Sequence, residues 1–280
     1  MTTTLPAPAA TGRHAARVPI PEVSNHISLR QTIANSLTMA YRGILKIKHN
    51  PEQLFDVTIQ PILFTALFAY IFGGAFAGSV QAYLPVLIPG ILVQTVVLTS
   101  VVTGTQLRED MDKGVFDRFK SLPIARVSAL AGALVADMVR YGLATTLTVV
   151  VGLILGYRPG GGVLGVVVAG AVVIFCSFAV SWIWALVGVT GKSASAVQGI
   201  SMMIMFPLTF MSGAFALVST MPGWLQAINK ANPVYYMVNS CRELMNGNVY
   251  SSNLLWCLVG SVVVIMIFAP LAIRAYMRRA

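Results

Sequence analysis

The chain contains little charge. Asp, Glu, Lys and Arg make up 10% of its 280 residues, against roughly a quarter in soluble domains. So few charged groups cannot cover a water-exposed surface, which excludes an ordinary soluble domain. The net charge of +10 would suggest nucleic acid as the partner of a soluble chain. Here the basic residues flank apolar segments, where anionic lipid of the inner leaflet is the expected counter-charge, so we expect no nucleic-acid partner.

Cysteine and histidine are also scarce. Three cysteines lie in or near apolar segments with no CxxC or Cys/His spacing, a pattern typical of small packing residues rather than of a metal site or a disulfide framework. The three histidines all precede the first apolar segment, and no paired carboxylates occur, so nothing supports an intramembrane enzyme. These residues are Cys176, Cys241, Cys257, His14, His26 and His49.

A phosphate-binding loop is excluded as well. Gly191-Lys192-Ser193 resembles the end of such a loop, but its required first glycine is replaced by Leu186. We therefore expect no catalytic, cofactor-binding or metal-binding residues in this chain.

Long apolar segments are abundant. Six of them have about the 20 residues that cross a bilayer as a helix. They cover approximately residues 57–76, 83–107, 128–156, 163–189, 194–218 and 254–273. The sequence therefore predicts an all-α membrane protein with six transmembrane helices.

The 19 Lys and Arg residues predict how these helices are oriented. All but four lie at the two chain ends or in the connections after the second and fourth segments. The exceptions are Arg158, Lys230 and Arg242 in the other connections, and Arg140 inside the third segment. Because Lys and Arg are retained on the cytoplasmic side, we expect a multi-pass protein of the cell membrane with both termini cytoplasmic.

The region before the first segment has two parts. Residues 1–25 are rich in Thr, Ala and Pro and contain no apolar core, so they are not a secretory signal and indicate a disordered cytoplasmic tail. Within residues 26–50, apolar side chains recur every three or four positions from Leu29 to Ile44, with Arg42 and Lys46 on the other face. This pattern predicts an amphipathic helix lying along the inner membrane interface. A soluble helix that packs on a partner is the alternative.

The connection after the second segment contains four of the nine acidic residues. Apolar residues of this connection share one helical face, and Pro123 ends the element. Such amphipathicity in a short element favours contact with a partner over a merely solvated loop. The candidate contact residues are Glu109, Asp110, Asp112, Lys113, Phe116, Asp117, Arg118 and Lys120.

Four polar residues lie within the apolar segments. Gln60 and Gln94 need hydrogen-bond partners in hydrocarbon, so each either joins two helices or lines a pathway. Asp137 and Arg140 are three residues apart and therefore neighbours on one helix face. They form either a neutralising pair or a site for proton relay or a substrate counter-ion.

The connection from Ser219 to Asn253 is apolar for a loop. Two short amphipathic helices separated at Asn232-Pro233 fit this pattern, either dipping into the outer leaflet or capping the spans.

These features together resemble the type-2 ABC exporter permeases, specifically the daunorubicin-resistance transporter permease group, over nearly the whole chain after Asn50. The likeness is carried by Phe55-Asp56-Val57-Thr58-Ile59-Gln60-Pro61, Phe72-Gly73-Gly74, Leu87-Ile88-Pro89-Gly90-Ile91, Gly114 to Ile124, Ala196-Val197-Gln198-Gly199, Met221-Pro222-Gly223-Trp224-Leu225 and Asn232-Pro233. Ser193-Ala194-Ser195 departs from the group, where a Pro and an acidic residue are frequent.

The resemblance implies a fold and partners. Residues 51–280 would form a type-2 ABC transmembrane domain with a re-entrant outer hairpin before the last span, and residues 26–50 its connecting helix. Two copies would bind two copies of a separate subunit that binds ATP and Mg. The segment from Glu109 to Lys120 would be the coupling helix seated on that subunit.

The expected function is therefore that of the membrane-spanning permease of an ATP-driven exporter, which is not itself an enzyme. Its cargo would be a hydrophobic or amphipathic molecule, either a drug-like compound or a lipid. Two alternatives are the permease of a polysaccharide or lipid-linked glycan exporter and a proton-coupled secondary transporter. The second would ordinarily need more ionisable residues within its spans.

Overall fold

The structure, a computed structural model, describes residues 29–48, 51–115 and 126–279. Within these ranges the chain is all-α, with nine α-helices and one short 3-10 helix. The helices are α1 (Leu29–Lys48), α2 (Pro51–Ala77), α3 (Val80–Asp112), α5 (Arg126–Ile154), α6 (Gly162–Thr190), α7 (Ala194–Met211), η1 (Val218–Thr220), α8 (Gly223–Asn229), α9 (Pro233–Met245) and α10 (Ser252–Arg279).

Six of these helices are long and apolar enough to cross a membrane, namely α2, α3, α5, α6, α7 and α10. The prediction of six spans is thereby confirmed. The fifth span is shorter than expected, because α7 ends at Met211 and not near residue 218. The chain turns at Gly213, whose φ of 82° is a conformation that glycine adopts without steric cost.

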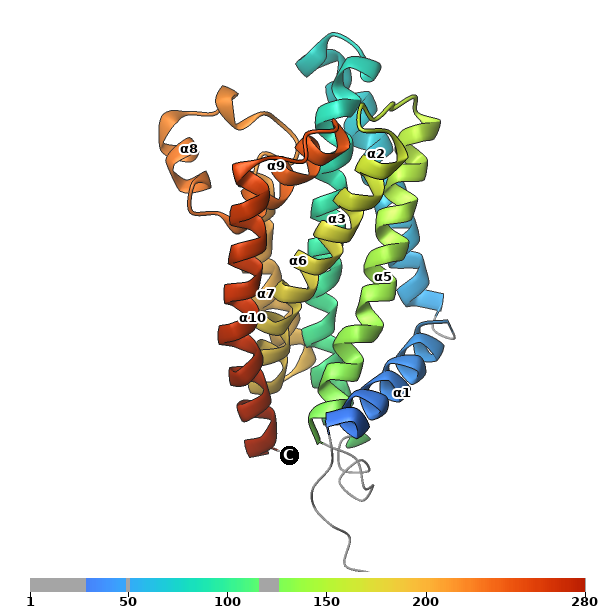
Figure 1. The fold of residues 1–280 in the computed structure, drawn as a ribbon, viewed down its shortest axis with the longest axis vertical. Coiled ribbons are helices and arrows are strands. Elements are labelled where there is room, and N and C mark those ends of the chain that lie inside the picture. Colours follow the sequence, from blue (N-terminus) through green and yellow to red (C-terminus); the bar gives the residue numbers. More distant parts are fainter. Residues whose placement is uncertain (1–28, 49–50, 116–125, 280) are drawn as a thin grey trace, which may run out of the picture.

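The six long helices run up and down in one bundle with two different ends (Figure 1). At one end lie α1, the last residues of α3, α6 and α10, and the first residues of α5 and α7; we call it the basic end. The opposite end, which carries α8 and α9, is the hairpin end. Among the described residues, Arg158, Lys230 and Arg242 belong to the hairpin end.

Helix α3 is the centre of the bundle. It contacts α2, α5, α6, α7 and α9. Of the apolar part of α3, 83% is buried, against 50% or less in the other five spans. Every residue from Leu87 to Val101 is buried, which explains why the apolar residues there are not confined to one stripe.

Two glycines allow α3 and α6 to touch. A Cβ on Gly104 would lie 2.4 Å from the carbonyl oxygen of Trp184, and a Cβ on Gly188 would lie 2.3 Å from the carbonyl oxygen of Gly104. Only glycine permits backbones to approach so closely, as is common where helices cross in membranes. The crossing fixes α3 against α6 close to the basic end.

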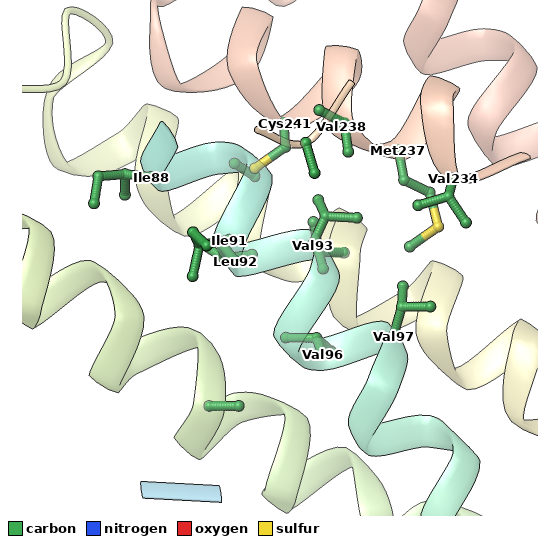
Figure 2. Packing of buried hydrophobic residues seen from close by; sticks show 14 of the residues in the cluster. Ile88, Ile91, Leu92, Val93, Val96, Val97, Val234, Met237, Val238 and Cys241 are labelled. Carbon is green, nitrogen blue, oxygen red and sulfur yellow. The ribbon is translucent and has the colours of Figure 1, made fainter. Parts of the chain in front are cut away.

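The hairpin end contains the two short helices expected from the sequence. The chain breaks at Asn232, whose side-chain oxygen accepts a hydrogen bond from the Val234 amide at 3.0 Å, and Pro233 is the first residue of α9. Helix α9 lies across α3 and points Val234, Met237, Val238 and Cys241 at it (Figure 2). It therefore caps the spans.

Helix α8 differs from α9. Its main contact among the helices is η1, and it projects sideways from the bundle (Figure 1). Trp224 at its start is 66% exposed. Its apolar residues are therefore available to a lipid or a second protein.

Helix α1 packs on α5 through a face that the sequence reading did not identify. Its small residues Ala40 and Gly43 approach α5, where a Cβ on Gly43 would lie 2.6 Å from the Ala136 Cβ. The apolar stripe of α1, by contrast, leaves Leu37 59% and Tyr41 64% exposed. Small residues bring the helices together, and the large apolar ones face outward.

Candidate functional site

The last three turns of α3, from Thr103 to Asp112, carry polar side chains that reach three other helices. The apolar body of α3 ends here, next to the segment that the sequence predicts to contact a partner.

The first contacts join α3 to α5. Asp137 and Arg140 on α5 form an ion pair, with 3.0 Å between Nη1 and Oδ1, and they are 5% and 2% exposed. The Thr103 hydroxyl donates to the Asp137 carboxylate at 2.5 Å and lies 3.3 Å from the Tyr141 hydroxyl. Arg140 also donates to the side-chain oxygen of Gln106 at 3.3 Å. We call these five residues the α3–α5 cluster.

The two charged residues of the α3–α5 cluster can be buried because each has the other as its counter-ion and also has a hydrogen-bond partner. A buried charge is costly unless it is paired and hydrogen-bonded. Asp137 accepts from Thr103 and Arg140, which meets this requirement. One donor, the Nε of Arg140, is buried without a partner.

The next contacts join α3 to α6 and α7. The Thr105 hydroxyl donates to the side-chain oxygen of Gln198 on α7 at 2.9 Å. Arg108 donates to the carbonyl oxygen of Gly191 at 3.0 Å and pairs with Asp112. Gly191 is the C-terminal cap of α6, so this cation also compensates the negative end of the helix dipole.

The predicted coupling residues divide into two groups. Glu109, Asp110 and Asp112 belong to α3 itself, and Lys113 caps it. The sequence predicted that these residues belong to a coupling helix separate from the second span, so this part of the prediction is wrong. Two i,i+4 ion pairs, Arg108–Asp112 and Glu109–Lys113, extend the helix past its apolar part. Gly114, at a φ of 65°, ends it. The other group, Phe116, Asp117, Arg118 and Lys120, lies outside the described residues.

Gln60 and Gln94 lie apart from these contacts. Gln94 is buried in the middle of α3, and Gln60 is half-buried on α2. Neither forms a hydrogen bond with the α3–α5 cluster in the part of the chain that the structure describes.

The sequence alone did not identify Thr103, Gln106 and Gln198 as residues that join the helices. The spacing of Thr103 and Gln106, three apart and therefore on one helix face, was the available signal.

A second polar site lies at the hairpin end. Arg242 on α9 is 8% exposed and has no carboxylate partner among the described residues. Its guanidinium donates to the carbonyl oxygens of Val86 at 3.0 Å, Gly213 at 2.6 Å and Ala214 at 3.3 Å. Burial lowers the pKa of Arg242 to about 10, so it remains protonated at neutral pH. Arg242 therefore ties α9 to α3 and to the turn after α7.

Replacement of Arg242 by methionine is expected to destabilise the protein by about 2 kcal/mol, because buried carbonyl groups lose their donors. Removal of the cation also removes the free-energy cost of burying it. The three carbonyl groups stay buried, however, and cannot accept hydrogen bonds from water instead. The thermal unfolding of the purified protein in detergent measures the effect. Lys230→Met, at an exposed position of the same end, is the matched control. Equal stability of the two variants would show that the carbonyl contacts are unimportant.

Phenylalanines form a continuous strip along α2, α7 and the turn after α7. Rings on α2 stack at centroid distances of 5.9, 5.3 and 5.5 Å, and Phe68 stacks on Phe215 at 4.2 Å. The strip continues through Phe210 to Phe206 at 4.9 and 4.3 Å. Its members are Phe64, Phe68, Phe72, Phe76, Phe206, Phe210 and Phe215; we call it the phenylalanine strip. Phe76 and Phe206 are exposed, so the strip reaches the outer surface of the bundle.

Comparison with known proteins identifies the family. The chain is 44% identical over 246 residues to the daunorubicin resistance ABC transporter permease protein DrrB1 of Streptomyces coeruleorubidus. The matched region covers 87% of this chain and 86% of the relative. It is 24% identical over 168 residues, 60% of each chain, to a probable doxorubicin resistance ABC transporter permease protein DrrC of Mycobacterium tuberculosis. These relatives are named as permeases and not as enzymes. Residues 35–246 match the ABC-2 type transporter family, and the chain therefore belongs to that family as a membrane-spanning permease.

Proposed function

We propose that this permease is the membrane subunit of an exporter driven by ATP, which a separate subunit binds and hydrolyses. The basic end would face the cytoplasm and receive that subunit. The cargo would be a hydrophobic or amphipathic drug-like molecule, moved outward across the cell membrane.

The distribution of basic residues supports this orientation. Arg108, Lys113, Lys192 and Arg274 lie at one end of the bundle, together with the C-terminus (Figure 1). Retention of Lys and Arg in the cytoplasm would place this end inside. The ATP-binding subunit would then dock where the polar turns of α3 emerge.

The position of α3 is the observation that carries the proposed mechanism. It is the central helix, and its last turns lead directly into the segment that resembles a coupling helix. Arg108 connects these turns to the end of α6, Thr105 connects them to α7, and Thr103 connects them to α5. A displacement of the coupling segment would thus reach three other spans through one helix.

ATP can drive transport through this path only if the ATP-bound and ATP-free partner contact the coupling segment differently, since a ligand shifts an equilibrium only by its differential affinity. Closure of the ATP-binding subunits would then move α3. The spans packed on α3 would shift with it and open an outward path. A second copy of the permease would complete this path, as the resemblance implies.

Two surface helices, α1 and α8, support the proposed orientation of the bundle in the membrane. Exposed Leu37 and Tyr41 on α1 would lie in the inner interface, next to Arg42 on the polar face. Exposed Trp224 and Ile228 on α8 would enter the outer leaflet, as expected for a re-entrant hairpin.

The phenylalanine strip and the names of the relatives support the proposed class of cargo. Planar aromatic compounds stack on aromatic side chains at the centroid spacing found within the strip. The curated relatives are named for resistance to daunorubicin and doxorubicin. Vesicles that contain the permease and its ATP-binding subunit should therefore accumulate an anthracycline-like dye when ATP is added outside. Preferential movement of a fluorescent lipid would instead favour a lipid cargo.

The coupling role has its own test. Phe116→Ala combined with Asp117→Lys is expected to reduce ATP-dependent export at least about tenfold, corresponding to the loss of about 1.4 kcal/mol of coupling free energy. The same variant should still insert in the membrane, because neither residue falls in an apolar segment of the sequence. Lys230→Glu at the hairpin end is the control and should export normally. Unchanged export by the double variant would refute the assigned role of the segment.

A further inference from the structure

Two of the three cysteines form a pair between helices that are remote in sequence. The sulfur atoms of Cys176 on α6 and Cys257 on α10 lie 3.2 Å apart, and both side chains are buried. Helices α6 and α10 pack on each other. A disulfide requires a sulfur–sulfur separation of about 2.0 Å, so closure of this pair needs an approach of only about 1 Å.

Two hydroxyl groups lie beside the pair in an otherwise apolar region. The side chain of Ser261 lies beside Cys176, and that of Ser240 lies beside Cys257. Each hydroxyl donates to a backbone carbonyl oxygen, Ser261 to Cys257 and Ser240 to Tyr236, so it must rotate to donate to a sulfur anion, the reactive form of a cysteine. Cys257 occupies the second turn of α10, next to residues such as Trp256 and Val259 that are exposed on the outer face of the bundle.

The third cysteine provides an internal comparison. Cys241 is also buried, but it lies on α9 over α3 (Figure 2), and its sulfur contacts the Met245 sulfur at 3.9 Å. Burial and apolar surroundings are thus common to all three cysteines. Only Cys176 and Cys257 have a thiol as the direct neighbour.

We propose that Cys176 and Cys257 are a dithiol modification site that an apolar organic hydroperoxide oxidises to a disulfide between α6 and α10. One thiol loses its proton, and its sulfur attacks the terminal oxygen of the hydroperoxide. The oxygen–oxygen bond breaks, the terminal oxygen stays on the sulfur as a hydroxyl group, and the remaining alkoxide takes up the proton and leaves as an alcohol. The resulting sulfenic acid is attacked by the second thiol, which forms the sulfur–sulfur bond and releases water. Two thiols are oxidised and one hydroperoxide is reduced, so atoms and electrons balance. An apolar oxidant is specified because it partitions into the bilayer, where the pair lies.

The test treats the membrane-embedded protein with cumene hydroperoxide, unfolds it, and counts thiols by alkylation and mass spectrometry. We expect the number of free thiols to fall from three to one, with the loss of two hydrogen atoms and a linked peptide that joins Cys176 to Cys257. Cys241→Ser should form the same link and leave no free thiol. Cys176→Ser and Cys257→Ser should each form no link; the variant that retains the attacking thiol should carry it as a sulfenic acid, and the other should keep both remaining thiols.

Three results would overturn the proposal. They are three free thiols after oxidation of the unaltered protein, a linked peptide that contains Cys241, and oxidation of Cys176 and Cys257 only to separate sulfinic acids. The unaltered protein supplies the decisive measurement, so the proposal remains testable if a serine variant does not fold. None of these readouts involves transport, and failure of the proposed export function would not change them.

Discussion

Replacement of Asp137 by alanine is expected to lower the free energy of unfolding by about 4 kcal/mol, because the cation of Arg140 would remain buried without its counter-ion. Arg140 would keep only Gln106 as a side-chain partner, at 3.3 Å. Unfolding in mixed detergent micelles measures the effect. Little functional permease should reach the membrane.

The double variant Asp137→Leu with Arg140→Leu distinguishes the two roles left open by the sequence, a neutralising pair or a site for proton relay or a substrate counter-ion. Replacement of a buried ion pair by apolar residues of similar size is often neutral, so we expect most of the lost stability to return. If the pair serves only to neutralise its own two charges, export should return with the stability. A double variant that folds normally but does not export would contradict a purely neutralising role and show that export needs the polar groups of Asp137 or Arg140.

The second large effect is expected at the crossing of α3 and α6. Gly104→Ala should destabilise the protein by about 3 kcal/mol, the upper part of the range for an overpacked core. The added Cβ would lie 2.4 Å from the Trp184 carbonyl oxygen, which belongs to a helix backbone and cannot move like a flexible side chain. Gly188→Ala should have a similar effect, since its Cβ would lie 2.3 Å from the Gly104 carbonyl oxygen. Thermal unfolding in detergent measures both.

Gly142→Ala is the matched control for these glycines. Gly142 is also inside a transmembrane helix, but apart from its chain neighbours and the nearby backbone of its own helix no heavy atom lies within 4 Å of the position of an added Cβ. Alanine should therefore be tolerated there. Equal stability of the Gly104 and Gly142 variants would show that α3 and α6 are not in backbone contact.

Local features of this fold were predictable from the sequence. Six apolar segments of sufficient length correspond to six long helices, because helix length and apolarity are properties of each segment alone. The break between α8 and α9 follows from Asn232 and Pro233, which cap and start a helix through neighbouring atoms. Asp137 and Arg140 are neighbours for the same reason, since residues three apart share a helix face.

Contacts between helices were not predictable in this way. Thr103, Arg108 and Gln198 acquire their roles only because α5, α6 and α7 surround α3, and the pairing of spans is not encoded in the pattern of one segment. Helix α1 illustrates the same limit. Its amphipathic stripe indicated which residues are apolar, whereas close packing on α5 uses the small residues Ala40 and Gly43. Shape, rather than hydrophobicity, decides such contacts in a membrane.

The direction in which the bundle lies in the membrane is the claim on which the mechanism depends. It is tested by single cysteines, Lys113→Cys at the basic end and Lys230→Cys at the hairpin end, in a background without the three native thiols. Both native residues are exposed. A membrane-impermeant maleimide applied to intact cells should label the protein at position 230, and at position 113 only after the membrane is permeabilised. Labelling at position 113 in intact cells would place the basic end outside, where no ATP-binding subunit could reach it.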